Sequence, residues 1–250
     1  MAYAHNGGMR IHYRVIGDGP PLVLYHGFGL TLKAWYLFGY VETLRKRYRV
    51  ILIDSRGHGA SDKPHDPEQY SFDFDVADTL AVLDQLEIDR AALWGYSSGG
   101  RVALQLAHSA PARASAIIVG GQDAAARRVP PHFNIDPENP EASLARIYDI
   151  ANVSEEGISL LKRQPILTND FHALAAAGQH GYSSLEHVLP AMPMPCLFYA
   201  GELDPSYRDI VRYRSSVTVV GLPGLTHTTG FVESPRILET VLPFLSHAYG

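Results

Sequence analysis

Apolar residues along the chain fall into two recurring patterns. Short continuous apolar runs, which are typical of strands buried on both faces of a sheet, occupy residues 49–53, 91–94, 114–119, 196–200 and 217–220. Elsewhere apolar residues recur every three or four positions, which predicts amphipathic helices over residues 34–48, 72–86, 101–107 and 235–245. Strands that alternate with helices in this way predict an α/β fold with a largely parallel sheet.

The beginning of the chain predicts two further strands. Residues 9–16 alternate in character, residues 21–25 are apolar, and the segment Gly17-Asp18-Gly19-Pro20 between them has the composition of a tight turn. Two strands joined by such a turn predict an antiparallel hairpin at one edge of the sheet.

The regular alternation stops after the strand predicted at residues 114–119. Residues 124–195 are too many for one crossover helix, and several prolines interrupt them. We predict a small helical cap over the sheet edge at residues 124–168, because extra length at such a loop is often an active-site lid. An elaborated crossover is the alternative. Residues 1–250 would then form one domain that contains this insertion.

Composition and charge narrow the class of protein. Hydrophobic residues make up 46% of the chain and charged residues 19%, which allows a sizeable core. The net charge of −5, with no basic cluster, argues against a nucleic-acid or membrane partner. The single cysteine, Cys196, has no partner for an internal disulfide. With no signal-peptide pattern and no long apolar stretch, we expect a cytoplasmic protein.

The junction after residues 91–94 carries the sequence Gly95-Tyr96-Ser97-Ser98-Gly99. A Gly-x-Ser-x-Gly sequence between a strand and a helix is typical of a nucleophile elbow, in which a strained serine projects from the carboxyl edge of a sheet. The flanking glycines are expected because a Cβ there would collide with a neighbouring strand or helix. A glycine-rich turn without chemistry, or one that binds phosphate, is the alternative; neither the P-loop nor the dinucleotide-binding pattern is present.

A serine becomes a nucleophile at neutral pH when an imidazole takes its proton and a carboxylate orients that imidazole. Ser97, Asp204 and His227 each follow a predicted parallel strand, in one of the orders known for this geometry. Since the carboxyl ends of parallel strands share one edge, we expect the three residues to converge as a catalytic triad. Asp123 is the alternative acid. We reject His58 as the base, because its glycine-rich loop has a structural explanation.

Two backbone N–H groups are predicted to form the oxyanion hole, those of Phe28 in His26-Gly27-Phe28-Gly29 and of Ser98. An ordinary strand-to-helix loop would also explain the first of these segments. Candidate substrate-binding residues are apolar or aromatic side chains near the site or in the predicted cap, and core packing is the alternative for each: Trp35, Tyr96, Phe133, Tyr148 and Leu203.

Together these segments resemble the ordered signature of the α/β-hydrolase superfamily: His26-Gly27-Phe28-Gly29, Asp54-Ser55-Arg56-Gly57-His58-Gly59-Ala60-Ser61, Gly95-Tyr96-Ser97-Ser98-Gly99-Gly100, Gly201-Glu202-Leu203-Asp204 and Gly224-Leu225-Thr226-His227. The resemblance implies the α/β-hydrolase fold, an eight-stranded, mostly parallel sheet flanked by helices with only the second strand antiparallel. It also implies that no cofactor is needed, and we expect no metal.

Within that superfamily the chain is similar to small capped serine hydrolases, which include enol-lactonases, carboxylesterases and carbon–carbon bond hydrolases. We therefore expect hydrolysis of a small or medium-sized ester or lactone through an acyl-enzyme. A carbon–carbon bond hydrolase with the same triad, or a hydrolase-like ligand sensor with slow turnover, is the alternative. The sequence makes no prediction of the oligomeric state.

Overall fold

The computed structural model describes residues 2–127, 135–140, 142–143, 145 and 170–249. Most of the predicted cap, residues 124–168, lies outside these residues, so the cap and the division of the chain that contains it stay predictions. No helix within the described ranges is both long enough and apolar enough to cross a membrane.

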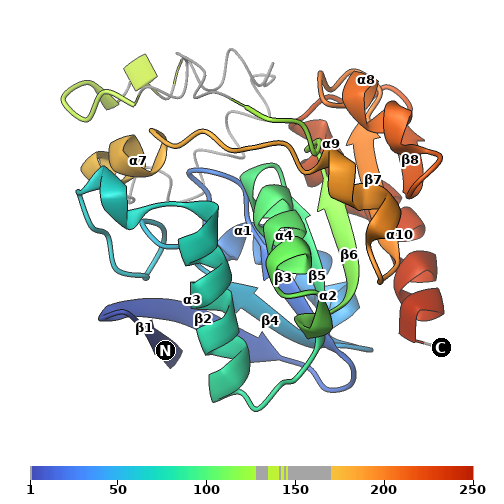
Figure 1. The fold of residues 1–250 in the computed structure, drawn as a ribbon, viewed down its shortest axis with the longest axis horizontal. Helices are drawn as coiled ribbons and strands as arrows, with labels where there is room; N and C mark the ends of the chain where they lie inside the picture. Colours follow the sequence, from blue (N-terminus) through green and yellow to red (C-terminus); the bar gives the residue numbers. More distant parts are fainter. Residues whose placement is uncertain (1, 128–134, 141, 144, 146–169, 250) are drawn as a thin grey trace.

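An eight-stranded sheet lies at the centre of the fold (Figure 1). Its strands are β1 (Ala2–Asn6), β2 (Met9–Ile16), β3 (Pro21–Tyr25), β4 (Arg49–Ile53), β5 (Ala91–Tyr96), β6 (Ala114–Gly120), β7 (Cys196–Gly201) and β8 (Thr218–Leu222). They lie in the order β1-β2-β4-β3-β5-β6-β7-β8, and β2 alone runs opposite to the other strands. The predicted eight-stranded, mostly parallel sheet is confirmed.

One predicted strand pairing is wrong. β2 and β3 do not form a hairpin, because β4 lies between them and pairs with both. The hairpin at this edge joins β1 to β2 through a two-residue turn at Gly7 and Gly8, with Asn6 opposite Met9. β3 instead has parallel neighbours on both sides, β4 and β5, which suits its continuous apolar sequence.

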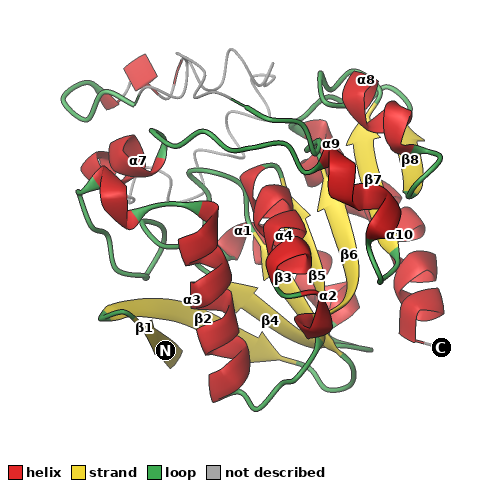
Figure 2. Cartoon of the chain, viewed as in Figure 1, coloured by secondary structure: helices red, strands yellow, loops and turns green. Residues whose placement is uncertain are grey.

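Helices cover both faces of the sheet (Figure 2). α3 (Phe72–Gln85) and α4 (Ser98–Ser109) pack on one face, whereas α1 (Lys33–Leu37), α2 (Tyr40–Leu44) and α10 (Ser234–Tyr249) pack on the other. The single helix predicted over residues 34–48 is divided into α1 and α2 at Gly39, whose φ of 81° lies in the left-handed region. Three further short helices are α7 (Phe171–Ala177), α8 (Tyr207–Ile210) and α9 (Thr229–Val232).

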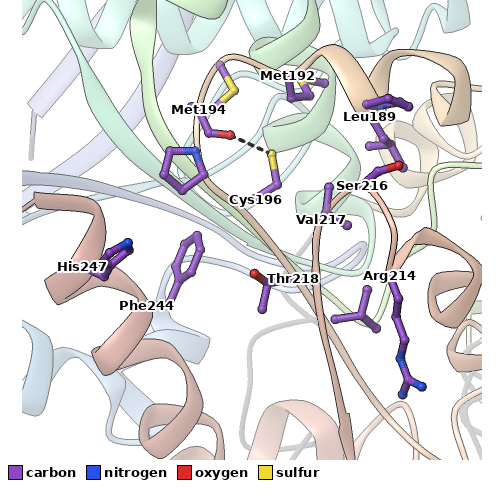
Figure 3. Close-up of a pocket in the computed structure, with 13 residues that line it drawn as sticks. Leu189, Met192, Met194, Cys196, Arg214, Ser216, Val217, Thr218, Phe244 and His247 are labelled. Carbon is purple, nitrogen blue, oxygen red and sulfur yellow. Dashed lines mark hydrogen bonds between the residues drawn. The ribbon is translucent and has the colours of Figure 1, made fainter.

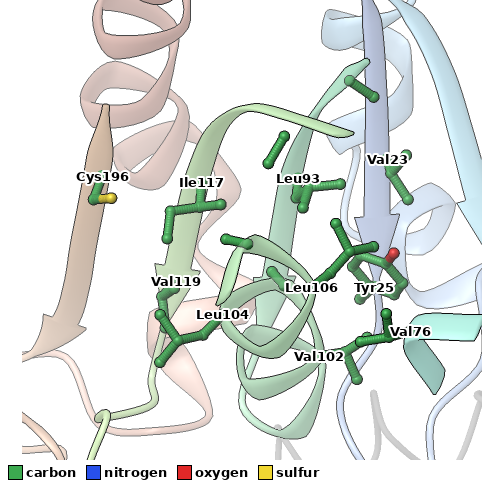
Figure 4. Packing of buried hydrophobic residues seen from close by; sticks show 14 of the residues in the cluster. Val23, Tyr25, Val76, Leu93, Val102, Leu104, Leu106, Ile117, Val119 and Cys196 are labelled. Atoms are coloured by element: carbon green, nitrogen blue, oxygen red, sulfur yellow. The ribbon is translucent and has the colours of Figure 1, made fainter. Parts of the chain in front are cut away.

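Each inner strand contributes to two cores, because successive side chains point to opposite faces of the sheet. In β5, Ala91 and Leu93 lie in the core beneath α3 and α4, whereas Ala92 and Trp94 lie in the core beneath α1, α2 and α10. Figure 4 shows part of the first core, in which α4 packs on β3, β5 and β6: Val102, Leu104 and Leu106 with Val23, Leu93, Ile117 and Val119. The apolar runs in the sequence therefore reflect burial on both faces.

Backbone hydrogen bonds join the first residues of the predicted cap to residues that follow it. Arg127 and Tyr182 donate to each other's carbonyl oxygens at 3.0 and 2.9 Å, and the Leu185 N–H donates to the Ala124 carbonyl at 2.7 Å. Arg101 of α4 braces this stem, because its guanidinium donates to the Ser183 carbonyl and lies 4.3 Å from the centroid of the Tyr182 ring. Arg127 and Tyr182 thus lie side by side next to α4.

A buried ion pair anchors the loop that follows β4. The Arg56 guanidinium donates to both carboxylate oxygens of Asp78 in α3, at 2.8 and 3.1 Å, and both side chains are about 96% buried. Arg56 also donates to the Gln69 carbonyl, and Asp78 accepts from the side-chain amide of Asn6. Each side-chain nitrogen of Arg56 and each carboxylate oxygen of Asp78 therefore has a hydrogen-bond partner. These bonds connect the loop to α3 and to β1.

Replacing Arg56 by Leu would leave the Asp78 carboxylate buried without its counter-ion. We expect the free energy of unfolding to fall by about 3–5 kcal/mol in urea denaturation. The matched control is Arg45→Leu, because Arg45 pairs with Glu42 on the surface and an exposed pair contributes less than about 1 kcal/mol. Equal losses in the two variants would contradict the anchoring role of the buried pair.

Candidate active site

Ser97 occupies the turn between β5 and α4 in a strained backbone conformation, with φ 54° and ψ −123°. Hydrogen bonds hold this turn on both sides. The Ser97 N–H donates to the Gly120 carbonyl of β6 at 2.8 Å, and its carbonyl accepts from the N–H groups of Gly100 and Arg101. The half-buried side chain follows the carboxyl end of β5, as the elbow pattern predicts.

The two glycines around Ser97 allow backbones to pack against each other without side chains. A Cβ at Gly95 would lie 2.0 Å from the carbonyl oxygen of Gly99, and a Cβ at Gly99 would lie 2.5 Å from the carbonyl oxygen of Tyr25 in β3. Both separations are far below van der Waals contact. The collisions predicted from the sequence are therefore confirmed.

The His227 ring lies between Ser97 and Asp204. Its Nδ1 is 2.7 Å from Oδ2 of Asp204, and its Nε2 is 3.1 Å from Oγ of Ser97. With its proton on Nδ1, a neutral imidazole donates to the carboxylate and accepts from the serine hydroxyl. The arrangement can therefore take the proton of Ser97 and stabilise the imidazolium that results.

Asp204 is almost fully buried, and its carboxylate is fully hydrogen-bonded within the protein. Oδ1 accepts from the backbone N–H and from the hydroxyl of Ser206, both at 2.9 Å, while Oδ2 accepts from His227. Burial by itself raises the pKa of Asp204, but these hydrogen bonds outweigh it and hold that pKa below its ordinary value. The sequence analysis missed Ser206, although an Asp followed two residues later by Ser is a signal for an Asx-turn.

Tyr96 and one backbone contact fix the position of His227. The Tyr96 hydroxyl donates to the His227 carbonyl, and the two ring centroids lie 5.3 Å apart. The N–H of Leu203 donates to the Leu225 carbonyl at 3.0 Å, which joins the loop of Asp204 to that of His227. Tyr96, which was predicted to bind substrate, is itself buried and packs against the His227 ring.

The alternative acid and base lie in other networks. Asp123 accepts from the Ala125 N–H at 2.8 Å and from the Arg127 guanidinium at 3.3 Å, so its carboxylate is engaged by these two residues. Burial raises its pKa despite Arg127. His58 is buried beneath the loop after β3, where burial lowers its pKa to about 3. Among the described residues, no group of three His, Cys, Asp or Glu side chains could hold a metal ion.

The predicted oxyanion residues belong to two segments that adjoin Ser97. Ser98 is the first residue of α4, where an N–H has no acceptor within the helix. The loop of Phe28 passes beside the serine, since a Cβ at Gly27 would lie 3.5 Å from the Cβ of Ser97. β3 and β5 are parallel neighbours with Tyr25 opposite Gly95, so both segments begin at the same level of the sheet edge.

Of the other predicted substrate-binding residues, Trp35 and Leu203 lie within the described part of the chain. Trp35 is fully buried and packs edge-to-face on three aromatic rings at 4.9 to 5.2 Å: Tyr40, Trp94 and Phe231. It belongs to the core, because α1 turns that side chain toward β5. Leu203 is 65% exposed beside Asp204, while Phe133 and Tyr148 lie outside the described residues.

A pocket of about 730 Å³, shown in Figure 3, lies at the amino ends of β7 and β8. Ser97 instead follows the carboxyl end of β5. Cys196, Thr218, Phe244 and His247 are among the residues that line it. The Cys196 thiol donates to the Met194 carbonyl, and burial raises its pKa to about 12. The thiol therefore stays protonated, which makes it a poor nucleophile.

Replacing Gly99 by Ala would force a methyl group against the backbone of β3. We expect the free energy of unfolding to fall by about 3 kcal/mol or more, measured by urea denaturation. Gly27→Ala is the matched control, because its Cβ would meet its nearest neighbour at an ordinary 3.5 Å. That variant should lose less than about 1 kcal/mol. Wild-type stability in Gly99→Ala would contradict the close approach of α4 to β3.

Comparisons with known proteins agree with this fold. Residues 20–149, slightly more than half of the chain, match the family described as alpha/beta hydrolase fold. Over 269 aligned residues the chain is 32% identical to 2-hydroxymuconate semialdehyde hydrolase from Pseudomonas sp. (strain CF600), covering 96% of this chain and 92% of that protein. Several other curated relatives align with less than half of this chain and with 29% to 40% of their own length.

Solved structures share the same architecture over the whole chain. The enol-lactonase from Burkholderia xenovorans LB400 superimposes with a TM-score of 0.83 at 23% identity, covering 98% of this chain and 100% of that one. A thermophilic esterase from Thermogutta terrifontis does so with a TM-score of 0.79 at 22% identity, covering 100% and 99%. At such identities the likeness concerns the fold. Taken with the family match and the curated relative, it shows that this chain belongs to the α/β-hydrolase fold family.

Proposed function

We propose that this protein is a serine hydrolase that cleaves a carboxylic ester or a lactone of small to medium size through an acyl-enzyme intermediate. The observation that carries the proposal is the position of the His227 ring, within hydrogen-bond distance of both Ser97 and Asp204. A nucleophile, its base and an orienting carboxylate in this arrangement are typical of acyl transfer to a serine.

In the acylation step, Oγ of Ser97 attacks the carbonyl carbon of the substrate while Nε2 of His227 takes the hydroxyl proton. The carbonyl oxygen becomes an oxyanion, to which the N–H groups of Phe28 and Ser98 donate. Collapse of this tetrahedral intermediate breaks the bond to the leaving alkoxide, which receives the proton from His227. The products are the free alcohol and an ester on Ser97; with a lactone, the alcohol stays attached to the acyl group.

Deacylation uses the same residues with water as the nucleophile. Nε2 of His227 takes a proton from the water as its oxygen attacks the acyl carbon, and the oxyanion forms again between the two N–H groups. Oγ of Ser97 then leaves with the proton held by His227, and the carboxylic acid is released. Throughout both steps Asp204 stays ionised and stabilises the imidazolium, in keeping with its depressed pKa.

The named relatives support hydrolysis but differ in the bond they act on. Neighbours in structure include an enol-lactonase and an esterase, which favours a lactone or ester as the substrate. The 32% identity to 2-hydroxymuconate semialdehyde hydrolase favours a second candidate, cleavage of a carbon–carbon bond by the same triad. Turnover of a ring-fission semialdehyde compared with that of esters and lactones distinguishes the two.

A test of the triad begins with a small fluorophosphonate, which labels an activated serine. We expect one adduct, located on Ser97 by peptide mapping, that is lost in His227→Ala. With an ester substrate, Ser97→Ala and His227→Ala should lower kcat by at least about 10³-fold, and Asp204→Asn by about 10³–10⁴-fold. Asp123→Asn is the matched control for the acid and should stay within about threefold of wild type.

Near-wild-type kcat in Ser97→Ala would defeat the proposed chemistry. If instead Asp123→Asn is the variant that loses activity and Asp204→Asn is not, the assignment of the acid is wrong while the hydrolase stands. A labelled Ser97 combined with very slow turnover and a tightly retained product would favour the ligand-sensing alternative.

A substrate panel tests the size and the class of the acyl group. We expect kcat/KM for acetate and butyrate esters and for small lactones to exceed that for a long-chain triglyceride by at least about 100-fold, a difference of about 2.7 kcal/mol in the barrier. Initial rates under identical conditions are sufficient. Comparable values across the panel would contradict a small or medium-sized substrate, and a preference for a ring-fission semialdehyde would establish the second candidate.

A further inference from the structure

Two buried histidines outside the predicted triad, His26 and His58, make hydrogen bonds to the loop that contains Phe28. His26 follows β3 in the loop that contains Phe28, and His58 lies in the loop that follows β4. Nε2 of His26 accepts from the N–H of Ser55 in the second loop, and Nε2 of His58 accepts from the N–H of Gly29 in the first, both at 3.1 Å. The imidazole of each loop therefore accepts a hydrogen bond from a backbone N–H of the other loop.

The second nitrogen of each ring fixes its tautomer. Nδ1 of His26 lies 2.9 Å from the Gly27 carbonyl oxygen, and Nδ1 of His58 lies 2.9 Å from the Arg56 carbonyl oxygen. A carbonyl can only accept a hydrogen bond and an amide N–H can only donate one. Both imidazoles must therefore carry a proton on Nδ1 and none on Nε2, which makes both neutral.

The burial of these rings is consistent with neutrality. Burial lowers the pKa of His26, and it lowers that of His58 to about 3, in each case against the smaller opposing effect of the Asp54 carboxylate. The rings lie 5.2 Å apart, and the Phe28 ring packs edge-on against His58 at 5.6 Å. The two imidazoles form one packed unit, which we call the histidine clasp.

The histidine clasp makes hydrogen bonds to both peptide units that adjoin the Phe28 Cα. The first unit joins the Gly27 carbonyl to the Phe28 N–H, and the second joins the Phe28 carbonyl to the Gly29 N–H. In a planar trans peptide the carbonyl and the N–H point in opposite directions. His26 holds the Gly27 carbonyl and thereby sets the direction of the Phe28 N–H, while His58 holds the N–H of the second unit.

Other contacts support the same backbone. The Leu30 N–H also donates to the Gly27 carbonyl, at 3.1 Å. Asp54 accepts from the N–H of Leu32 at 2.7 Å and from that of Ala60 at 3.0 Å, which ties the far side of the first loop to the second. The rotation of the Phe28 peptide is thus restricted from both loops, and loss of the Gly29 contact would release only one of these restraints.

We propose that His58, acting with His26, is a positioning residue that orients the Phe28 N–H toward the oxyanion. This inference rests on the proposed function, because the role of Phe28 in the oxyanion hole comes from it. A hydrogen-bond donor contributes to catalysis when it points at the place where the oxyanion develops, so a small rotation of this peptide lowers kcat more than it affects the binding of the ground state.

The test compares His58→Gln with His58→Asn. The glutamine amide reaches the position of Nε2 and can accept from the Gly29 N–H, whereas the asparagine amide replaces Nδ1, keeps the bond to the Arg56 carbonyl and loses the acceptor. With an ester that wild type hydrolyses, we expect kcat to fall about 10- to 100-fold in His58→Asn with KM within about threefold of wild type. His58→Gln should retain kcat within about fivefold of wild type.

Equal kcat in His58→Asn and wild type, or equal losses in the two variants, would overturn the positioning role. A change confined to the free energy of unfolding in urea, with kcat unchanged, would do the same. Should His58→Asn not fold, the comparison of His58→Gln with His58→Leu replaces it, and the same split between kcat and KM is expected.

A second readout does not depend on activity. In ¹⁵N spectra of the wild-type imidazoles, His26 and His58 should both appear as the neutral tautomer protonated on Nδ1, in contrast to the Nε2-protonated form that predominates in free histidine. Wild type that neither hydrolyses esters nor labels on Ser97 would defeat the proposed function, while these spectra would still test the clasp. Observation of Nε2-protonated rings would overturn the clasp itself, even in an active enzyme.

Discussion

The contact between the backbone of α4 and the ends of β3 and β5 is the constraint on which the rest of the site depends. Its glycines let α4 begin directly against the sheet, and Ser97 accepts a φ of 54° as a consequence. Such strain costs free energy and persists only where the surroundings hold it. Here the bond from Ser97 to the Gly120 carbonyl and the packing of α4 on the sheet supply that support.

Around this rigid centre the polar residues of the site are held by hydrogen bonds to backbone groups rather than by exposed charge pairs. Ser206 fixes Asp204, Tyr96 fixes His227, and the imidazoles of His26 and His58 fix the loop of Phe28. Buried polar groups of this kind are costly unless every partner is present. The geometry of the candidate site is therefore set by the protein's own contacts, which is what the proposed stabilisation of an oxyanion requires.

Local patterns in the sequence predicted most of the fold, because the strands beneath the helices are buried on both faces and carry continuous apolar runs. The turn at Ser97 was also predictable from the sequence, because few side chains fit at Gly95 and Gly99. β1 escaped prediction because Ala2–Asn6 is short and of mixed character, and its conformation depends on pairing with β2. The place of β4 between β2 and β3 is a property of the tertiary structure that no local pattern encodes.

For the site, sequence order indicated which residues follow strand ends but not which side chains face one another. That limit explains why Trp35 was predicted to bind substrate, since an aromatic side chain suits a pocket wall and a core equally well. In the structure Trp35 packs in the core against β5. It also explains why the sequence left Asp123 as a possible acid, since its carboxylate turns toward Arg127 rather than toward the triad histidine. Buried histidines that accept from backbone N–H groups carry no sequence signal of their own.

The hydrogen-bonded stem at Arg127 and Tyr182 has a consequence for how such a protein can diversify. Arg127 and Tyr182 pair beside α4, so the chain between them is closed into a loop at this point. The entropic cost of closing a loop grows only slowly with its length, so a change in the number of residues between Arg127 and Tyr182 alters that cost only slightly. Under the proposed function, the length of this segment is therefore free to change without altering the contacts among Ser97, Asp204 and His227.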